Sequence, residues 1–567
     1  MRAVALLGLA GLATTVGGMP ARAANESVVG TWWSRSDPDW PIIPVHASLT
    51  PDGRVLTYGA GLANAAGQVT DPTVQTGKFV YDVWDPAFGL DGGHLTLPNS
   101  TPTDLFCSAQ LILPQSLDIL IVGGDNWTGT QTTNTGVNSS NLFRFSNNSL
   151  TPSANMNLPR WYATMTTLPD GGVYIQGGLG GEAHPEVRLP GGGFQLLSGI
   201  DTSGIFWSYP RAWVAPNGKI FGFSDRTMYY VDWHGTGTIT PLGDMPVDGP
   251  NGVTSTEVMY RPGKILRVGG GSYGPGVDSI GKTAAVIIDI NGPTPVVTPT
   301  APLPRGLNYA NATVIPDGRV VVTGGELGNN VMNTPNFNAL IWNPANGQWT
   351  WGSWTGSGMA RMYHSNGLLL PGGMILVTGG GAPGPQANNN AEIYYPPNLY
   401  NTSNQPAVRP VITQAPATLS IGLNFSVTVD NGAVFPTSGT VALIKTGAVT
   451  HGFNMDQRYI PLTYTRSGTK LTVKAPTSAY VAPPSSTRCA RMSWPCASSV
   501  RGRRCGQMAW WGRSGRLSDS AKSMLRSEAR GVAAGAALGY RAFPGQGRRL
   551  GDTVHPQVRG HQQGRLT

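Results

Sequence analysis

Short apolar runs separated by turn sequences recur along most of this chain. Seven segments each hold two such runs around a turn containing proline or glycine, and in most of them the second run ends in Gly-Gly. In chain order they read SLTPDGRVLTYGAG, LILPQSLDILIVGG, TTLPDGGVYIQGG, WVAPNGKIFGF, MYRPGKILRVGG, TVIPDGRVVVTGG and LLLPGGMILVTGG. Short apolar runs bounded by turn residues predict β-hairpins, so the chain is expected to contain seven of them.

The hairpins recur at a nearly regular spacing of roughly 45 to 65 residues, which is a length typical of propeller repeats. Several are followed by a third strand that carries Trp or Tyr, as in ALIWNPANGQWTWG. Glycine suits the strand ends because it tolerates tight bends and close backbone approach. We therefore predict an all-β protein in which residues 29–400 form a seven-bladed kelch-type β-propeller.

A second pattern of strands follows a linker rich in Pro, Asn and Thr. The stretches LNFSVTVD, TVALIKTG, RYIPLTYTRSG and TKLTVKAP alternate like strands with one buried face. This pattern predicts a small immunoglobulin-like β-sandwich over residues 407–484. The segment AVTHGFNMDQR, between the second and third of these strands, carries His451 on an expected loop. A loop histidine by itself is seldom a metal ligand.

Composition agrees with many short strands, since the 567 residues include 77 Gly and 46 Pro and only 12% are charged. The N-terminal stretch MRAVALLGLAGLATTVGGMPARAAN combines a basic residue, an apolar run and an Ala-Arg-Ala site. Residues 1–24 are therefore predicted to be a secretory signal peptide, and the protein is expected to be secreted, outside the cell or in a periplasm. Beyond that run, no apolar segment is long enough to predict a membrane span.

The net charge of +9 comes from one end of the chain. Residues 485–567 hold 15 Lys/Arg and 3 Asp/Glu, whereas the preceding residues hold 24 and 27, a balance of −3. This basic tail lacks sustained periodicity and contains Cys489, Cys496 and Cys505. We interpret it as a low-order extension or the product of a shifted reading frame, and expect no nucleic-acid partner. Outside it there is one cysteine, Cys107, a lone thiol for an oxidising compartment.

The turn proline of each hairpin is a reference point from which equivalent positions of the repeats can be compared. Seven residues before the proline of the second to seventh segments stand Cys107, Tyr162, Tyr209, Ser255, Tyr309 and His364. Equivalent positions in propeller blades lie around one axis, so these side chains are predicted to ring one mouth of the central channel. The first segment departs from this pattern, with Pro44 at the offset and His46 nearby.

Each of these residues has an ordinary explanation when taken alone. Tyrosine at a strand start is usually packing, and a lone buried cysteine usually behaves as a small inert hydrophobe. Cysteine, tyrosine and histidine at one shared offset, with Tyr363 beside His364, instead favour a functional site.

Four motifs carry a resemblance to a known family: DLFCSAQ, PRWYATMTTLPDGGVYIQGG, ARMYHSNGLLLPGG and THGFNMDQRYIPL. With them, residues 29–484 resemble the galactose oxidase/glyoxal oxidase-type copper radical oxidases. The resemblance implies a thioether bond between Cys107 and Tyr162. It also implies a copper ion held by Tyr162, Tyr363, His364 and His451.

The resemblance further implies a reaction in which aldehydes or primary alcohols are oxidised by O2 with release of hydrogen peroxide. Copper supplies one oxidising equivalent, and a Cys-Tyr radical on Tyr162 stores the second. Tyr363 would accept the substrate hydroxyl proton, and Tyr209, Arg211 and Tyr309 would line the substrate mouth. The expected partners are O2 and a small aldehyde or alcohol, including carbohydrates, and the expected assembly is a monomer.

Two departures from the family pattern keep alternatives open. Galactose-specific members carry a tryptophan shortly after the Gly-Gly of the Tyr162 blade, whereas this chain has Leu179 there, which favours aldehydes or small alcohols. After VAPP the chain continues as SSTRCARMSWPCASSV, which is no further sandwich strand and predicts an incomplete sandwich with a poorly held His451 loop. The alternatives are a catalytically degenerate relative and a non-enzymatic kelch protein that binds carbohydrate.

Overall fold

The computed structural model describes most of the propeller and sandwich region of the chain. The described residues are 25–34, 40–90, 92–276, 279–430, 440–484 and 487–488. The chain divides into two compact units, residues 1–497 and 498–567, and all described residues lie in the first. The predicted signal peptide lies outside the described residues, as does the predicted tail apart from residues 487–488.

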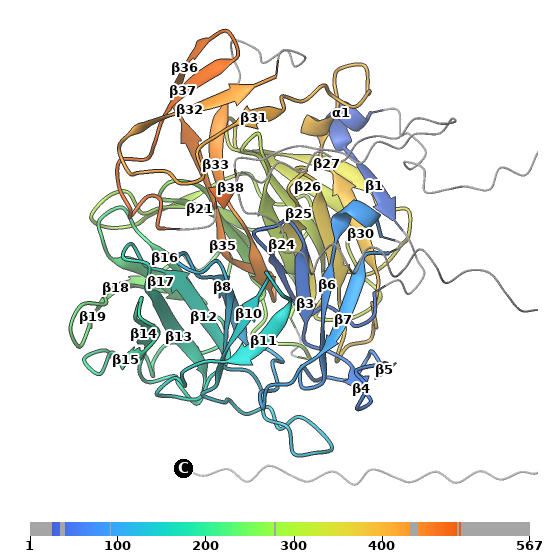
Figure 1. Cartoon of the computed structure of the whole chain (residues 1–567), viewed down its shortest axis with the longest axis vertical. Coiled ribbons are helices and arrows are strands. Elements are labelled where there is room, and N and C mark those ends of the chain that lie inside the picture. The colour runs from blue at the N-terminus through green and yellow to red at the C-terminus, as the bar shows by residue number, and fades with distance from the viewer. Residues whose placement is uncertain are drawn as a thin grey trace, which may run out of the picture. The chain divides into compact units, whose positions relative to one another are not determined.

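Seven four-stranded antiparallel sheets follow one another as the blades of a propeller (Figure 1). Blade one comprises, from the inside outward, β2 (His46–Leu49), β3 (Val55–Tyr58), β6 (Val80–Trp84) and β7 (His94–Pro98). Blade two comprises β8 (Ala109–Ile112), β9 (Ile119–Val122), β10 (Ser140–Arg144) and β11 (Ser149–Pro152). Blade three comprises β12 (Trp161–Thr167), β13 (Val173–Leu179), β14 (Glu186–Arg188) and β15 (Phe194–Leu196).

The remaining blades repeat this order. Blade four comprises β16 (Arg211–Val214), β17 (Ile220–Ser224), β18 (Thr227–Asp232) and β19 (Thr238–Asp244). Blade five comprises β20 (Ser255–Arg261), β21 (Lys264–Gly269), β22 (Ala285–Asp289) and β23 (Val296–Pro299). Blade six comprises β24 (Asn308–Val314), β25 (Val320–Glu326), β26 (Asn338–Asn343) and β27 (Gln348–Trp354). Blade seven comprises β28 (Ser365–Leu369), β29 (Ile375–Gly379), β30 (Ala391–Tyr395) and β1 (Thr31–Ser34).

Blade seven closes the ring with strands from both ends of the propeller segment. Its outermost strand, β1, pairs antiparallel with β30, with Thr31 opposite Tyr395. The N-terminal strand therefore fastens the last blade, a pairing between segments more than 350 residues apart in the sequence.

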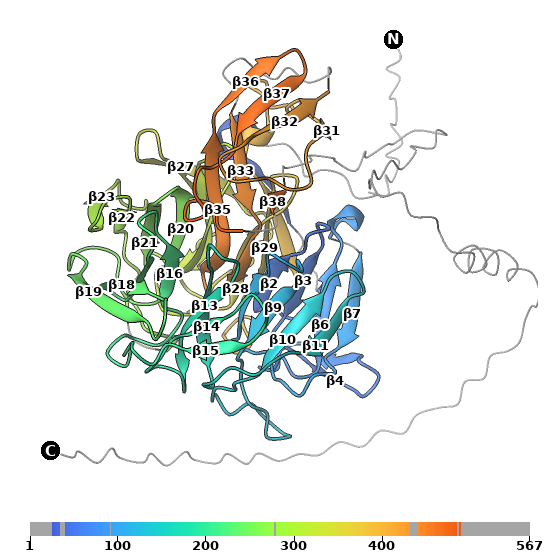
Figure 2. The same cartoon turned by 60° about the vertical axis from the view of Figure 1, so that its left-hand side comes forward.

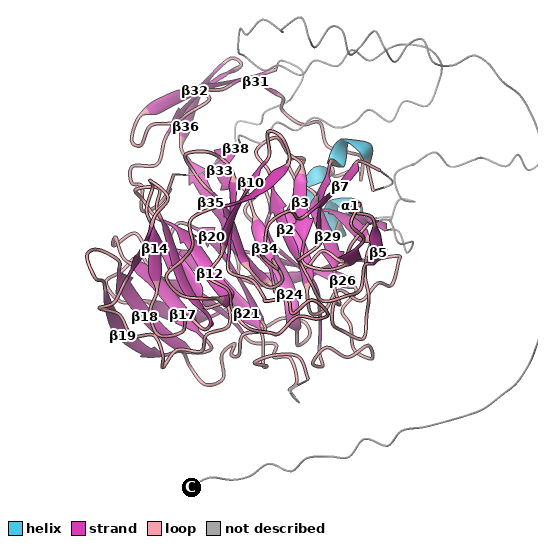
Figure 3. Ribbon diagram, turned by 60° about the horizontal axis from the view of Figure 1, so that its bottom comes forward, coloured by secondary structure: helices cyan, strands magenta, loops and turns pink. Residues whose placement is uncertain are grey.

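The blades pack face to face, which explains why their strands read as apolar runs. Between blades three and four, for example, Tyr174, Val187, Val214 and Ile220 lie in one buried cluster. A sheet buried on both faces needs apolar residues at successive positions rather than at alternate ones. The described helices are the short α1 (Glu26–Val29) and two 3₁₀ turns, so strands dominate the molecule (Figure 3). Within the described residues, no helix is long and apolar enough to cross a membrane.

A small β-sandwich follows the propeller. One sheet has the order β31 (Ile412–Gln414), β32 (Asn424–Val429), β37 (Lys470–Lys474) and β36 (Tyr464–Ser467). In the other, β33 (Val441–Lys445) pairs with β35 (Phe453–Leu462) and with the two-residue strand β38 (Thr487–Arg488). The core between the sheets contains Val427, Leu471 and Val473. The predicted all-β class, a propeller followed by a sandwich, is confirmed.

One hairpin joins the two domains. It consists of β34 (Ala448–Thr450) and the first half of β35, and it lies among the inner strands of the blades (Figure 2). Strand β34 pairs antiparallel with β2, and β35 pairs in parallel with β20. The inner strand of a blade has an unpaired edge toward the channel, and the hairpin satisfies two of these edges with backbone hydrogen bonds. The sandwich therefore reaches into the centre of the propeller.

Candidate active site

The five chemistry-bearing residues at the shared offset have a common and unusual backbone conformation. The φ angles of Cys107, Tyr162, Tyr209, Tyr309 and His364 are 55°, 72°, 41°, 58° and 69°. Residues other than glycine seldom adopt positive φ, and such strain concentrates at functional sites. The repeat thus supplies a strained position just before or at the start of the inner strand in five of the blades.

Backbone hydrogen bonds between neighbouring blades align these positions. The N–H of Tyr162 donates to the carbonyl of Cys107 at 2.9 Å, and the N–H of Tyr209 donates to the carbonyl of Tyr162 at 2.8 Å. Side chains that start from bonded positions in adjacent blades must emerge close together. The offset count therefore identified residues that the fold brings into contact.

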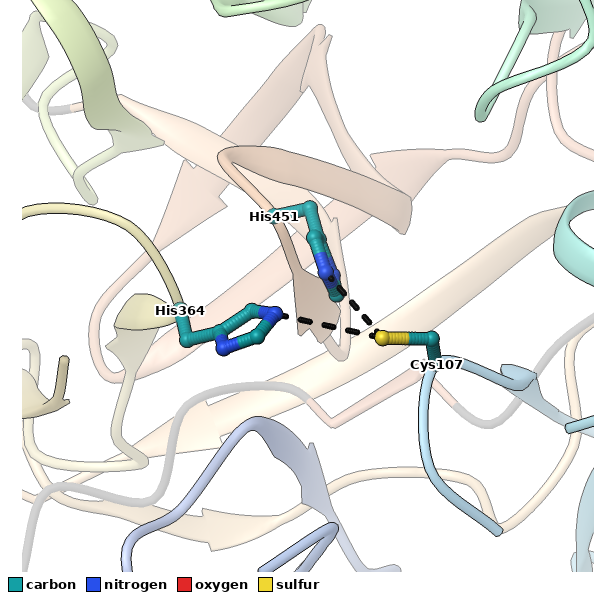
Figure 4. A group of neighbouring side chains, drawn as sticks. All are labelled: Cys107, His364 and His451. Carbon is teal, nitrogen blue, oxygen red and sulfur yellow. Dashed lines mark hydrogen bonds between the residues drawn. The ribbon is translucent and has the colours of Figure 1, made fainter. Parts of the chain in front are cut away.

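His451 completes the cluster from the hairpin. Its Nε2 lies 3.5 Å from the Cys107 Sγ, and the Nε2 of His364 lies 3.9 Å from the same sulfur (Figure 4). The ligand atoms of these three residues lie within 4.8 Å of one another. Beside them, the hydroxyl groups of Tyr162 and Tyr363 are hydrogen-bonded, and the Tyr363 ring stacks on His364 with centroids 3.8 Å apart. All five residues predicted to form the copper and thioether site converge.

Both histidines present a free ring nitrogen toward the cluster. Burial lowers the pKa of His364 to about 3 and that of His451 well below its usual value, so both rings are neutral. The Nδ1 of His364 lies 2.7 Å from the carbonyl oxygen of Gly381, which can only accept, so Nδ1 carries the proton. Its Nε2 therefore keeps a lone pair facing the Cys107 sulfur, the form in which imidazole binds a metal.

The phenols and the thiol are held in their neutral forms by the surroundings. Burial raises the pKa of Tyr162, Tyr363 and Cys107 well above their usual values, and a hydrogen bond from Tyr162 acts in the opposite direction on the thiol. A bound cation would reverse these shifts because it stabilises phenolate and thiolate. Two imidazole nitrogens and two phenol oxygens form a donor set that suits a tetragonal Cu(II) centre.

A cavity of about 350 Å³ opens beside this cluster. Tyr162, Tyr363 and His451 line it, so the converging groups form part of its wall. Six of the other lining residues are aromatic: Phe106, Trp161, Trp207, Tyr209, Tyr273 and Tyr309. Four more carry uncharged polar side chains: Gln75, Asn134, Ser208 and Thr254. None of the described lining residues is Asp, Glu, Lys or Arg. Such a cavity is suited to a small uncharged molecule.

Of the three residues predicted to contact substrate, two line the cavity and one does not. Tyr209 and Tyr309 are in its wall, whereas Arg211 is not. Arg211 is buried, donates to the carboxylate of Glu257 at 2.6 Å, and lies 4.8 Å from the ring centroid of Phe453 on the hairpin. The structure therefore places Arg211 as a brace between blades four and five and the hairpin.

Two tryptophans that the sequence analysis did not single out flank Tyr162. Trp161 and Trp207 both present an edge-to-face contact to its ring, with centroids at 4.4 and 5.8 Å. The family pattern predicted a tryptophan after the Gly-Gly of blade three, where Leu179 stands. Trp207 instead comes from the next blade, two residues before Tyr209, and Trp161 directly precedes Tyr162. Trp207 stands two residues before the shared offset, counted from the turn proline Pro216, so the repeat could have identified it.

The hairpin is held at the opposite end of the inner strands by Asp456 and Gln457. Asp456 accepts the backbone N–H of Ile112 at 3.0 Å and the Thr167 hydroxyl, and forms a buried ion pair with Lys445. Gln457 accepts from the N–H of Val314 at 3.0 Å and donates to its carbonyl at 3.1 Å.

These contacts follow the repeat of the propeller. Ile112, Thr167 and Val314 each stand two residues before the turn proline of their blade. Two consecutive residues of the hairpin therefore bind residues at equivalent positions in blades two, three and six: the backbone of Ile112 and Val314 and the hydroxyl of Thr167. These partners and Lys445 lie within residues 112–457. None of these contacts of Asp456 and Gln457 therefore depends on residues from 485 onward.

Comparison with known proteins agrees with this architecture. Residues 409–489 match the family described as the galactose oxidase-like early set domain. Galactose oxidase from Gibberella zeae is 29% identical over 478 residues, which cover 78% of this chain and 66% of that protein. An aldehyde oxidase GLOX from Vitis pseudoreticulata is 27% identical over 336 residues, which cover 54% of this chain and 62% of that protein. The chain thus spans somewhat less than two thirds of the length of these relatives.

A solved structure provides a further comparison. It is a fungal alcohol oxidase of the AA5 family in complex with copper, with a TM-score of 0.70 and 26% identity. The match covers 81% of this chain and 95% of the other. Together the comparisons confirm the resemblance to galactose oxidase and glyoxal oxidase-type proteins that the four motifs predicted.

Proposed function

We propose that this protein, as a relative of the galactose oxidase and glyoxal oxidase-type copper radical oxidases, oxidises aldehydes or primary alcohols with O2 and releases hydrogen peroxide. The observation that carries the proposal is the meeting of two histidine Nε2 atoms, two phenol groups and one cysteine sulfur beside a cavity that Tyr162, Tyr363 and His451 line. The copper-containing structural relative supports the choice of metal. Secretion, predicted from residues 1–24, is part of the same proposal.

Tyr162, Tyr363, His364 and His451 would hold the copper. Both imidazoles are neutral and present Nε2, and the two phenol oxygens lie side by side, so the donor set suits a copper ion. Copper bound there supplies a Lewis acid and a one-electron acceptor.

Oxidation of an alcohol or aldehyde removes two electrons, so the chain itself must store one oxidising equivalent. We assign this role to Tyr162 after a thioether bond joins its ring to the Cys107 sulfur. Formation of that bond removes one hydrogen from the thiol and one from the ring, and O2 is the oxidant that accepts them. An ortho thioether makes the phenol ring easier to oxidise, and burial among Trp161, Trp207 and Tyr209 keeps bulk water from the ring.

The two tyrosines would then act on different bonds of the substrate. Tyr363, at the cavity wall, would accept the proton of the substrate hydroxyl as general base. Tyr162 in its radical form would take a hydrogen atom from the substrate carbon. The Tyr162 and Tyr363 hydroxyls are in contact and both residues line the cavity, so a hydroxymethyl group held in the cavity against them would reach both.

The cavity wall indicates the kind of substrate. A volume of about 350 Å³ bounded by aromatic rings and by no described charged side chain favours a small uncharged aldehyde or primary alcohol. Arg211, predicted to line the substrate mouth, is instead paired with Glu257, so it offers no charged group to a substrate in the cavity. The cluster of two histidines, two tyrosines and one cysteine beside this cavity favours the oxidase over a non-enzymatic carbohydrate-binding propeller.

A peptide mass map tests the proposal directly. After incubation of the full chain with copper and oxygen, the peptides that contain Cys107 and Tyr162 should be joined and lighter by two hydrogen atoms. A Cys107→Ser variant should yield separate peptides and no peroxide, while the wild-type protein should release peroxide from uncharged alcohols or aldehydes. Separate wild-type peptides with a free thiol would contradict the proposed cofactor. A joined pair without peroxide across the substrate panel would favour the catalytically degenerate relative.

A further inference from the structure

The second ring nitrogen of His451 has a different partner from that of His364. Its Nδ1 lies 2.6 Å from the Oγ1 of Thr450, the preceding residue in the hairpin. The same Oγ1 lies 3.0 Å from the carbonyl oxygen of Val45, just before blade one begins. Thr450 is fully buried, so its hydroxyl has no access to bulk water.

The position of the protons follows from what each group can donate. A threonine hydroxyl has one proton, and a backbone carbonyl can only accept. Therefore the arrangement that satisfies both contacts has the hydroxyl donating to Val45 and accepting from Nδ1–H of His451. Nδ1 is then protonated and Nε2 is left with a lone pair, which faces the Cys107 sulfur at 3.5 Å.

We propose that Thr450 is a positioning residue for the metal centre: its hydroxyl accepts from His451 Nδ1–H and donates to the Val45 carbonyl, and this relay fixes the tautomer and ring orientation of His451. This inference rests on the proposed function, because it assigns His451 as a metal ligand. His364 needs no relay, since the Gly381 carbonyl binds its Nδ1 directly. His451 comes from another domain, and the relay ties its ring to the propeller.

The relay also explains why the hydroxyl is needed at this point. The backbone pairing of His46 with Thr450 fixes the position of the strand but leaves the His451 ring free to turn about its own bonds. Without the acceptor, the buried Nδ1–H would lose its only polar partner among the described residues, and the proton would be better placed on Nε2, where it would block the metal.

Three full-length variants test the inference. Thr450→Val keeps the shape of the side chain but removes the hydroxyl, Thr450→Ser restores it, and Thr378→Val is the matched control. Thr378 is equally buried, and its hydroxyl donates to the carbonyl of Asn390 in blade seven at 2.8 Å. The probe is Cu(II) alone, measured by competition with a chelator, together with the nitrogen hyperfine pattern of the Cu(II) EPR spectrum.

Thr450→Val should weaken Cu(II) binding by about 10- to 100-fold and change the hyperfine pattern, as loss of an outer hydrogen bond to a metal-bound histidine does. Thr450→Ser should recover most of the affinity, and Thr378→Val should bind like the wild type. Equal affinity and an equal spectrum for Thr450→Val and the wild type would overturn the inference. A wild-type protein that binds no Cu(II) would instead overturn the proposed function on which the inference depends.

A measurement on the unaltered, copper-free chain guards against a variant that fails to fold. Nitrogen NMR of protein labelled at histidine, with the His451 signals assigned by their loss in a His451→Gln variant, reports which ring nitrogen carries the proton. A protonated Nδ1 supports the relay. A proton on Nε2 overturns it, whatever the behaviour of the variants.

Discussion

The two sides of the candidate site are built in different ways. The ring of propeller residues, Cys107, Tyr162, Tyr209, Tyr309 and His364, occupies one position of a repeat, with positive φ at each. The hairpin contributes His451 alone, from a domain that is not part of the repeat. The ring residues are placed by the geometry of the blades, whereas His451 is placed by contacts specific to one hairpin.

Because of this difference, substitutions in the hairpin should affect the site more than substitutions around the ring. A ring residue is supported on both sides by neighbouring blades, as the hydrogen bonds from Tyr162 to Cys107 and from Tyr209 to Tyr162 show. The hairpin depends on its pairing with β2 and β20, on the Asp456 and Gln457 contacts, and on the Thr450 relay. Changes at these points should disturb metal binding while the propeller remains folded.

The largest effect is expected when the ion pair beneath the hairpin is broken. Asp456→Asn would leave the Lys445 ammonium buried without its partner, and burial already lowers the pKa of that lysine. Loss of one partner from a buried ion pair typically costs about 3 to 5 kcal/mol. We expect urea unfolding to show a free energy of unfolding that is lower by this amount. We also expect a smaller fraction of the protein to form the Cys107–Tyr162 cross-link in the peptide mass map.

The double variant Asp456→Asn/Lys445→Met serves as the control, because it removes the stranded charge together with its partner. It should recover much of the lost free energy of unfolding. If Asp456→Asn assembles the cross-link at the wild-type rate and unfolds at the wild-type urea concentration, the hairpin is not held as the structure indicates.

A smaller effect is expected from pH, at the point where blade one meets the hairpin. His46 lies opposite Thr450, its ring stacks on Tyr58, and burial lowers its pKa from 6.5 to about 3. Between these two pH values the unfolded chain binds a proton that the folded chain does not. The free energy of unfolding therefore falls as pH drops below 6.5, by about 1.4 kcal/mol per pH unit for this histidine, and its contribution is complete above pH 6.5.

Urea unfolding of the copper-free protein at pH 6.5 and pH 5 measures this slope. Other groups also titrate in the range, and Asp104, whose pKa burial raises to about 6, acts in the opposite direction. The wild type is therefore compared with His46→Gln. Between pH 6.5 and pH 5, the free energy of unfolding of the variant should fall by about 2 kcal/mol less than that of the wild type. Equal losses would show that His46 accepts a proton in the folded protein and that this boundary is open to water.

The smallest effect is expected from removal of residues 498–567, the second of the two units into which the chain divides. Asp456 and Gln457, which hold the hairpin, bond to residues of the first unit. The Cu(II) affinity of the truncated chain should therefore stay within about twofold of the full chain, because the truncation removes none of these contacts. A large loss of affinity would show that the hairpin needs support from beyond residue 497.

Much of the fold and of the ring could be predicted from the sequence because both depend on local repetition. Seven hairpins with their turn prolines gave the blades, and one offset from those prolines gave Cys107, Tyr162, Tyr209, Tyr309 and His364. Local periodicity reports which residues start a strand, and blades of equal construction bring equal positions together. The resemblance carried by the motifs then pointed to His451.

The tertiary structure decided what repetition cannot encode. Closure of the ring by β1, the pairing of His46 with Thr450, and the Val45 relay join segments several hundred residues apart. Arg211 stands two residues after Tyr209 at the start of blade four. Its side chain pairs with the carboxylate of Glu257 in the next blade and does not line the cavity. These pairings depend on which buried polar groups lie within hydrogen-bonding distance of each other after the chain has packed. The whole fold sets those distances.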